Sequence, residues 1–409
     1  MKNNILEQSN FACSGCGACA CICPKNAIEI QLDASGFYTA KIDENKCINC
    51  GLCKTVCTRY EETVGEISLY DSKVYAAQSS NEDVIRNSSS GGIACELSRW
   101  AVQNGYKVIG VTYDTEKNSA EHIIISAENE IVKLSGSKYL QSNPEKAFKE
   151  AVELAVQSAQ ERFVVFGTPC QISGLKKVIE QKHIREQFLL IEIFCHGVPS
   201  YKLWQKQCEK IQKKLGTNKF DSVIFRYKKD EWHNYCLRVD SGTQTFFGER
   251  EKELFWQVYF ENILLSDSCY HCRMRKEMTN ADIRLGDYWG KRYQEREDGV
   301  SVIFAPTEKG NDVISQLSEK KTIRFMGCGD AEEILRAQNM RGYHQKELHD
   351  KAMNALVESG DIQYAVKISR KGMTGKQKLK RKALRCSTFI PKKMRKKMRS
   401  MYRKVLLRR

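Results

Sequence analysis

The sequence predicts a chain of α+β and α/β fold class: a small cysteine-rich domain, then a larger α/β core, then a basic helical tail. Three observations predict this order. Two four-cysteine runs lie within residues 1–62, strand-like apolar runs alternate with amphipathic helices from about residue 73, and residues 362–409 contain 19 Lys and Arg but no Asp or Glu. Alternating strands and helices are typical of α/β domains.

The two cysteine runs have the same spacing. The first is Cys13-x2-Cys16-x2-Cys19-x3-Cys23 and the second is Cys47-x2-Cys50-x2-Cys53-x3-Cys57. Bacterial two-cluster ferredoxins use this spacing, and the fourth cysteine of each run ligates the cluster of the other run. We therefore expect one 4Fe–4S cluster on Cys13, Cys16, Cys19 and Cys57 (the cluster I site) and another on Cys47, Cys50, Cys53 and Cys23 (the cluster II site).

Some alternatives to this assignment stay open. A zinc ribbon or a disulfide framework also concentrates cysteines, although zinc ribbons use two CxxC pairs rather than two four-member runs. Thr58 stands where the first run has Pro24, and Cys21 is a surplus thiol that could exchange with a neighbouring ligand. The N-terminus lacks the apolar stretch of a signal peptide, so we expect a reducing, cytoplasmic setting.

Local patterns predict the elements of the first domain. Residues 27–32 and 37–42 alternate apolar and polar side chains, and Ala34-Ser35-Gly36 between them supplies a turn. This pattern predicts a β-hairpin between the two cysteine runs. The polar stretch 61–72 that follows is interpreted as a linker to the core.

The core is expected in two halves, 73–200 and 201–345. In the first half we expect strands at 107–111, 163–166 and 189–194 and helices at 93–103 and 145–160; in the second, helices at 201–215 and 253–265 and strands at 222–227 and 282–285. The aromatic stretch 255–260 is interpreted as core packing rather than as a cofactor site.

The charge is concentrated in the tail. The chain has a net charge of +16, and residues 362–409 contribute +19, so the rest carries 16 − 19 = −3. Cations interleaved with Met, Leu, Tyr and Phe favour a basic amphipathic helix on an anionic membrane. Nucleic acid is a weaker candidate partner, and a solvated tail is a third interpretation. No run reaches the ~18 apolar residues of a membrane span.

Several core motifs carry chemistry. The Ser88–Gly92 stretch (Ser-Ser-Ser-Gly-Gly) precedes a helix, where backbone N–H groups can bind a phosphate, and Gly136-Ser137-Lys138-Tyr139 places a cation and a phenol in a loop. Cysteines follow two strands and form one later pair; they are Cys170, Cys195, Cys269 and Cys272. These four could hold a third cluster (the core site), a structural zinc, or no metal at all. No G-x-G-x-x-G follows a strand.

Six motifs in fixed order resemble the family of coenzyme F420 hydrogenase/dehydrogenase beta subunits, here with a fused N-terminal ferredoxin domain. They lie at residues 88–92, 136–142, 167–172, 195–200, 268–272 and 285–290. The resemblance covers about residues 1–310 and leaves the tail outside it.

The resemblance implies a flavoprotein with FAD in the α/β core and favours the third cluster. It makes the two loop motifs FAD contacts, namely Ser88, Ser89, Ser90, Gly91, Gly92, Gly136, Ser137, Lys138 and Tyr139. Lys138 is expected near flavin or phosphate. His196 is a candidate proton donor, although an ordinary hydrogen-bonding role is the stronger interpretation. Asp287 and Trp289 would either order the substrate face or only pack.

The expected function is an oxidoreductase that couples hydride exchange with F420 or another organic carrier to one-electron transfer through the clusters. Ferredoxin or another redox protein is the expected partner. A narrower version acts in cell-surface polysaccharide biosynthesis, with the tail holding the protein at the inner face of the membrane. The alternative is a non-enzymatic electron-relay subunit, and a nucleic-acid-binding protein with structural clusters is the third possibility.

Overall fold

The computed structural model describes residues 3–61, 64–229, 232–275, 277–289, 291–293, 295–338, 346–375 and 377–379, with Lys382 and Met394. Most of the predicted tail therefore lies outside the described residues. This includes most of residues 376–409, for which we predicted a basic amphipathic helix. In the described part of the chain, no helix combines the length and apolar character needed to cross a membrane.

The N-terminal domain contains the predicted hairpin. Strand β1 (Ile28–Leu32) pairs antiparallel with β2 (Tyr38–Ile42), with Ile28 opposite Ile42. The short helices are α1 (Ala18–Ile22), α2 (Leu52–Thr55) and η1 (Thr58–Tyr60). The Asp33 carboxylate accepts the N–H groups of Ser35 and Phe37, and Gly36 between them has φ 80°. These bonds close the turn, because glycine adopts positive φ without steric cost.

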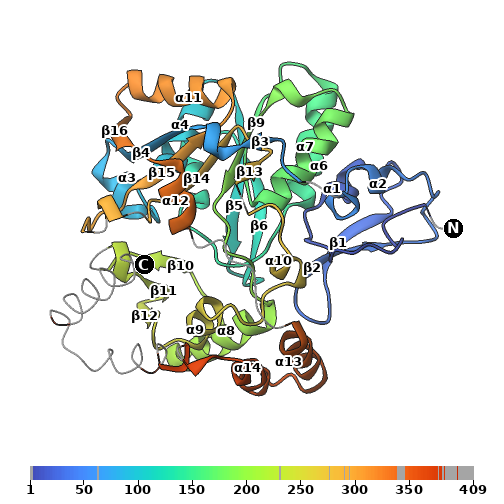
Figure 1. Ribbon diagram of the computed structural model, residues 1–409, viewed down its shortest axis with the longest axis vertical. Helices are drawn as coiled ribbons and strands as arrows, with labels where there is room; N and C mark the ends of the chain where they lie inside the picture. The colour runs from blue at the N-terminus through green and yellow to red at the C-terminus, as the bar shows by residue number, and fades with distance from the viewer. Residues whose placement is uncertain are drawn as a thin grey trace.

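A nine-stranded mixed sheet forms the centre of the molecule (Figure 1). Its order is β16 (Ile323–Cys328), β4 (Lys73–Ser79), β15 (Ser301–Ala305), β14 (Ile283–Asp287), β9 (Phe188–Ile193), β8 (Phe163–Gly167), β5 (Lys107–Asp114), β6 (Ser119–Ile125) and β7 (Ser142–Asn143). The central strands β14, β9, β8 and β5 run parallel. Strands from both predicted halves of the core join in this one sheet.

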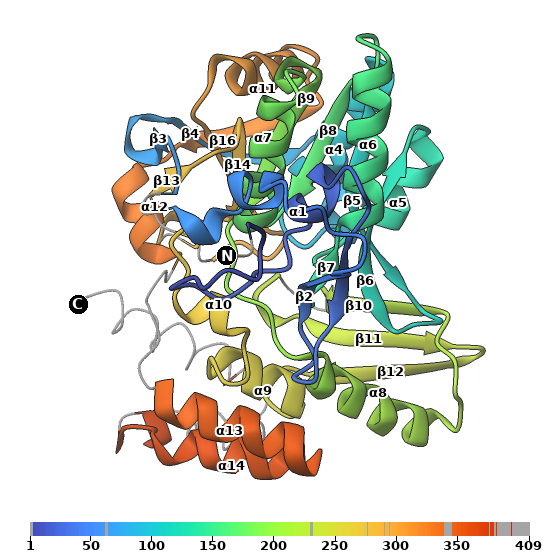
Figure 2. The ribbon, with the colours of Figure 1, turned by 90° about the vertical axis from the view of Figure 1, so that its right-hand side faces the viewer.

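Helices cover both faces of the sheet. The α6 (Glu145–Gln157) and α7 (Pro169–Gln181) helices lie on the side of the N-terminal domain, and α4 (Ile93–Gln103) and α11 (Glu308–Glu319) lie on the other (Figures 1 and 2). Side chains of β8 alternate accordingly: Phe163 and Val165 pack under α6 and α7, whereas Val164 packs with α4. This two-sided burial is the reason why the strand is almost wholly apolar.

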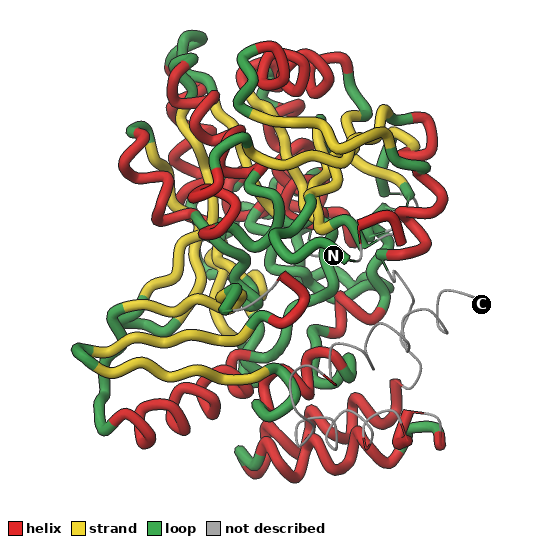
Figure 3. Tube along the Cα trace, turned by 90° about the vertical axis from the view of Figure 1, so that its left-hand side faces the viewer, coloured by secondary structure: helices red, strands yellow, loops and turns green. Residues whose placement is uncertain are grey.

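A second, smaller sheet lies apart from the first (Figure 3). It contains β10 (Ser222–Tyr227), β11 (Cys236–Ser241) and β12 (Gln244–Glu249), and it packs with α8 (Tyr201–Leu215), α9 (Leu254–Phe260), α13 (Lys346–Ser359) and α14 (Ile362–Lys371). Four residues of the aromatic stretch, Phe255, Trp256, Val258 and Tyr259, are buried there, which confirms core packing.

Two local predictions were wrong. The helix expected at 253–265 ends at Phe260, because Asn262 and Leu264 adopt positive φ, which breaks a right-handed helix. The stretch 61–72 is more than a linker, since β3 (Ile67–Ser68) pairs with β13 (Met278–Thr279) and Leu69 is fully buried. The remaining short elements are α3 (Glu82–Asn87), α5 (Ile131–Leu134), α10 (Asp267–Tyr270), α12 (Ala331–Ala337), η2 (Leu69–Asp71), η3 (Glu128–Glu130), η4 (Arg185–Gln187), η5 (Trp232–Asn234) and η6 (Lys291–Tyr293).

Candidate functional site

Cys170 lies at the start of α7, where the local sequence sets the helix cap. Thr168 is the N-cap and Pro169 begins the helix, and Thr168 and Gln171 form a reciprocal capping box. Proline at the first helical position and a capping box both favour helix initiation at this point. The motif Gly-Thr-Pro-Cys-Gln thus places the Cys170 thiol at the N-terminal end of α7, and the Thr168 hydroxyl lies 3.1 Å from its Sγ.

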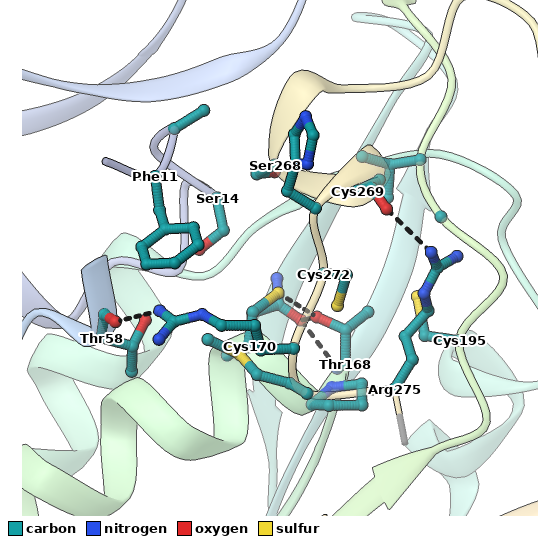
Figure 4. Close-up of a pocket in the computed structure, with 18 of the residues that line it drawn as sticks. Phe11, Ser14, Thr58, Thr168, Cys170, Cys195, Ser268, Cys269, Cys272 and Arg275 are labelled. Atoms are coloured by element: carbon teal, nitrogen blue, oxygen red, sulfur yellow. Dashed lines mark hydrogen bonds between the residues drawn. The ribbon is translucent and has the colours of Figure 1, made fainter. Parts of the chain in front are cut away.

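Arg275 connects the other two cysteine segments. Its guanidinium donates to the carbonyl oxygen of His196 (2.6 Å) and to that of Cys269 (2.8 Å; Figure 4). His196 directly follows Cys195, so this buried arginine joins the loop after β9 to the helix α10 that carries Cys269. A planar fork of donors suits two carbonyls at once.

Cys170, Cys195, Cys269 and Cys272 line one cavity of about 70 Å³ (Figure 4). Phe11, Ser14, Thr58 and Arg59 from the N-terminal domain line it as well. Burial raises the pKa of Cys170 to about 12 and that of Cys269 to about 11. Four converging thiols of this kind fit an iron–sulfur cluster, because bound iron stabilises the thiolate form that burial alone disfavours.

The cysteines of the N-terminal domain also lie in two groups, and this grouping is compatible with the crossed ligand pattern. Cys23, Cys47, Cys50 and Cys53 line a second pocket. In the other set, Cys13, Cys16 and Cys57, together with the surplus Cys21, lie close enough to influence the pKa of Cys19, which burial raises. Each run therefore sends its fourth cysteine to the other group. The surplus Cys21 lines neither pocket and packs against the apolar cluster of α6 and α7.

Hydrogen-bond donors already surround several of these sulfurs. The N–H groups of Gly15 and Ala40 point to Cys13 Sγ at 3.5 Å. Arg59 Nε donates to Cys57 Sγ at 3.5 Å, whereas the Asn4 amide approaches Cys47 Sγ at 3.6 Å. The cluster I site thus has a charged donor, which the sequence analysis missed. An arginine two residues after a ligand cysteine is the only hint that the sequence contains.

The two loop motifs expected to bind FAD contact each other. The backbone N–H of Ser137 donates to the Ser89 hydroxyl at 2.8 Å. Gly91 must be glycine, because a Cβ there would lie 2.6 Å from the carbonyl oxygen of Ala77. Gly92 has φ 86° and is the N-cap of α4. The Ser88–Gly92 segment therefore lies at a helix N-terminus beside the second loop, an arrangement that suits a phosphate group.

Lys138 and Tyr139 point to different surroundings within this loop. The Lys138 ammonium donates to the carbonyl oxygens of Leu134 (3.0 Å) and Ser135 (2.9 Å) at the end of α5, and burial lowers its pKa to about 7. The Tyr139 ring packs edge-on against Trp256 and Tyr259. In this structure Lys138 caps a helix, and it serves a ligand only if these bonds rearrange.

Asp287 takes part in a buried charged cluster close to these loops. Its carboxylate pairs with Arg226 at 2.5 Å and accepts the Trp232 indole N–H at 3.3 Å, and the Trp289 ring stacks on Trp232. Lys228 donates to the carbonyl oxygen of Ser90 at 2.8 Å. Two cations with alternate spacing, Arg226 on β10 and Lys228 directly after it, were the sequence feature that could have located this cluster.

His196 lies between the core cysteines and the aromatic cluster. Its Nε2 bonds the Asn262 side chain at 2.5 Å, and its ring centroid lies 5.0 Å from that of Tyr259, which also packs on Tyr139. Burial lowers the pKa of His196. This environment gives His196 a hydrogen-bonding role.

Family comparisons agree on three segments of the chain. Residues 74–149 match the model "Coenzyme F420 hydrogenase/dehydrogenase, beta subunit N-term", and residues 160–329 match the corresponding C-terminus model. Together these segments make up more than half of the chain. Residues 12–59 match the model of a 4Fe–4S dicluster domain.

Individual relatives are distant. A coenzyme F420-dependent sulfite reductase of Methanocaldococcus jannaschii is 24% identical over 335 residues, which cover 79% of this chain and 48% of the relative, so this chain spans about half of that protein. The beta subunit of the coenzyme F420 hydrogenase of Methanococcus voltae is 23% identical over 70% of this chain and 95% of its own. A chain of the F420-reducing [NiFe] hydrogenase complex from Methanosarcina barkeri aligns with a TM-score of 0.46 and 17% identity, over 72% of this chain and 95% of that one.

Proposed function

Because this chain belongs to the family of coenzyme F420 hydrogenase/dehydrogenase beta subunits and carries a 4Fe–4S dicluster domain, we propose that it is a flavin- and iron–sulfur-dependent oxidoreductase. It exchanges a hydride with F420 or another organic carrier, and single electrons with ferredoxin or another redox protein. The observation that carries this proposal is the cavity in which all four core cysteines meet residues of the dicluster domain. It supports a continuous set of one-electron sites that ends in the core.

The residues present fit the two kinds of cofactor. Three groups of four cysteines fit three 4Fe–4S clusters, and the contact between Ser89 and Ser137 supports one binding site built from both loop motifs. A bound flavin supplies the conversion between a two-electron hydride and single electrons. The chain itself contributes the helix N-terminus of α4 and the charged pair of Arg226 and Asp287.

Cofactor content tests this proposal. Anaerobically purified protein is expected to contain about 12 iron and one FAD per chain, and a Cys272→Ser variant about eight iron, because a cluster that loses one of four thiolates is not retained. Cys328→Ser, which changes an exposed cysteine outside all three groups, is the matched control and should keep 12. About eight iron without flavin in the unaltered protein would contradict the enzyme proposal and favour the electron-relay subunit.

The tail supports a second part of the proposal: attachment of a cytoplasmic enzyme to the inner face of an anionic membrane, as in a polysaccharide-assembly reductase. A truncation after Gly375 is expected to abolish pelleting with anionic vesicles while leaving the fold intact. A cut at residue 360 would be unsuitable, because α14 buries Ile362, Ala365 and Val366. Neutral vesicles are the control, and equal pelleting of both proteins with anionic vesicles would rule out attachment through the tail.

A further inference from the structure

Arg273 connects the core site to the N-terminal domain. It directly follows Cys272 in the chain, and its guanidinium donates to the carbonyl oxygens of Thr58 (2.7 Å) and Glu61. The Phe11 ring covers it, with the guanidinium carbon 3.7 Å from the ring centroid. Figure 4 shows Phe11 and Thr58 on the wall of the cavity that faces the core cysteines, and a dashed line marks the bond to Thr58.

The residues that Arg273 contacts flank the ligands of the cluster I site. Thr58 directly follows Cys57, and Phe11 comes two residues before Cys13. The Arg273 side chain therefore connects the core ligand Cys272, its neighbour in the chain, to residues that flank the first and last ligands of the cluster I site. The only non-covalent step between Cys57 and Cys272 along this path is the hydrogen bond from Arg273 to Thr58.

The two sites also share helix α7. Gly174 lies one helical turn after Cys170, and a Cβ on Gly174 would lie only 2.9 Å from Cys16 Sγ. A cluster I ligand thus packs directly on the helix whose N-terminal end carries a core ligand. Ser14 and Thr58, which directly follow the cluster I ligands Cys13 and Cys57, line the core cavity, whereas no residue of the pocket around the cluster II cysteines does. Among the described residues, the cluster I site is therefore the neighbour of the core site.

We propose that Arg273 is the positioning residue that holds the cluster I site against the core site so that single electrons pass between them. This role rests on the function proposed above, which requires both clusters. In that transfer one cluster loses one electron and the other gains it, and no bond forms or breaks. An arginine is needed because its planar fork can bond two carbonyls while its face lies on an aromatic ring, which a lysine cannot reproduce.

Docking of the N-terminal domain does not depend on Arg273 alone. Gln141 donates to the carbonyl oxygens of Ser14 and Tyr38, each at 3.0 Å. Asn143 donates to Ile30 at 3.1 Å, and the Ser200 hydroxyl to Ser35 at 2.6 Å. Variants of Arg273 are therefore expected to fold with the domain in place, and their effect is confined to the junction of the two sites.

The test is electron paramagnetic resonance of the full-length, dithionite-reduced protein. Neighbouring reduced clusters interact magnetically, and the two clusters of the dicluster domain do so with each other. The contribution of the core cluster is therefore the difference between the spectrum of the unaltered protein and that of Cys272→Ser, which lacks this cluster. Arg273→Gln and Arg273→Lys are expected to reduce this difference, because the cluster I site is no longer held against the core site, while keeping about 12 iron per chain. The matched control is Lys177→Gln, because Lys177 holds the Glu61 carboxylate in the same interface but does not line the core cavity; it should keep the difference.

Other outcomes would overturn the proposal. An unchanged spectrum in Arg273→Gln, or the full difference in Arg273→Lys, would show that the fork of hydrogen bonds is not needed. Identical spectra for the unaltered protein and Cys272→Ser would also overturn it. Should Arg273→Gln lose iron, Phe11→Leu decides, since it removes only the aromatic face and should reduce the difference. About eight iron in the unaltered protein would overturn the proposed function as well, whereas 12 iron with unaffected variants would overturn the role of Arg273 alone.

Discussion

Replacing Gly174 by alanine is expected to remove the iron of the cluster I site, about four of 12 per chain. The new Cβ would lie 2.9 Å from Cys16 Sγ and 3.0 Å from the Cβ of Ala18. A free thiol could rotate away from this contact, but a sulfur bound to a cluster cannot. The substitution favours the helix by about 1 kcal/mol, since alanine is the better helix former. Loss of iron would therefore have to come from the contacts with Cys16 and Ala18.

The measurement is iron and acid-labile sulfide per chain, together with the circular dichroism spectrum of the same sample. Ser173→Ala is the matched control: it changes the preceding residue of α7, which accepts a bond from Asn280 at 3.0 Å, and it should keep all iron. Full iron content in Gly174→Ala with an unchanged spectrum would mean that Cys16 is not held by a cluster.

Replacing Arg284 by methionine is expected to lower the free energy of unfolding by about 3–5 kcal/mol, the usual cost of leaving a buried charge without its partner. Arg284 and Glu192 are each 1% exposed and form an ion pair. Thr279 donates to the same Glu192 oxygen at 2.5 Å. Burial raises the pKa of Glu192, while the arginine opposes that shift. Without Arg284 the carboxylate would be buried and uncompensated.

The same substitution is expected to loosen the segment after Cys272. Arg284 donates to the carbonyl oxygens of Met274 and Met278, and both of these residues belong to that segment. Urea unfolding measures the stability, and iron content measures the effect on the core site. A double variant with methionine at Glu192 and Arg284 should recover part of the stability, because it leaves no unpaired charge.

An exposed ion pair provides the comparison for Arg284. Arg336 pairs with Glu332 on the surface of α12, where their side chains are 78% and 57% exposed. Arg336→Met should cost less than about 1 kcal/mol. Similar losses in Arg284→Met and Arg336→Met would contradict the assignment of a buried, structurally required pair.

Short-range sequence features predicted many of the elements. The helices at 93–103 and 201–215 and the strand at 222–227 have the predicted bounds, because their apolar periodicity and capping residues act over a few neighbours. The predicted end of the helix at 253–265 was wrong, because the positive φ values of Asn262 and Leu264 are not indicated by any local sequence pattern. Strand order in the large sheet, which mixes both halves of the core, was likewise outside what periodicity can indicate.

The sequence alone determined the composition of the candidate sites, because cysteine spacing within a run limits which thiolates can reach one cluster. It also located the two loop motifs and the core cysteines through their order along the chain. Only the tertiary structure decided that Ser89 contacts Ser137, that the core cysteines share a cavity with Phe11 and Thr58, and that Arg273 and Gly174 form the junction. These contacts join residues far apart in the chain, and they arise from packing of the N-terminal domain on α6 and α7, which leaves no periodic trace in the sequence.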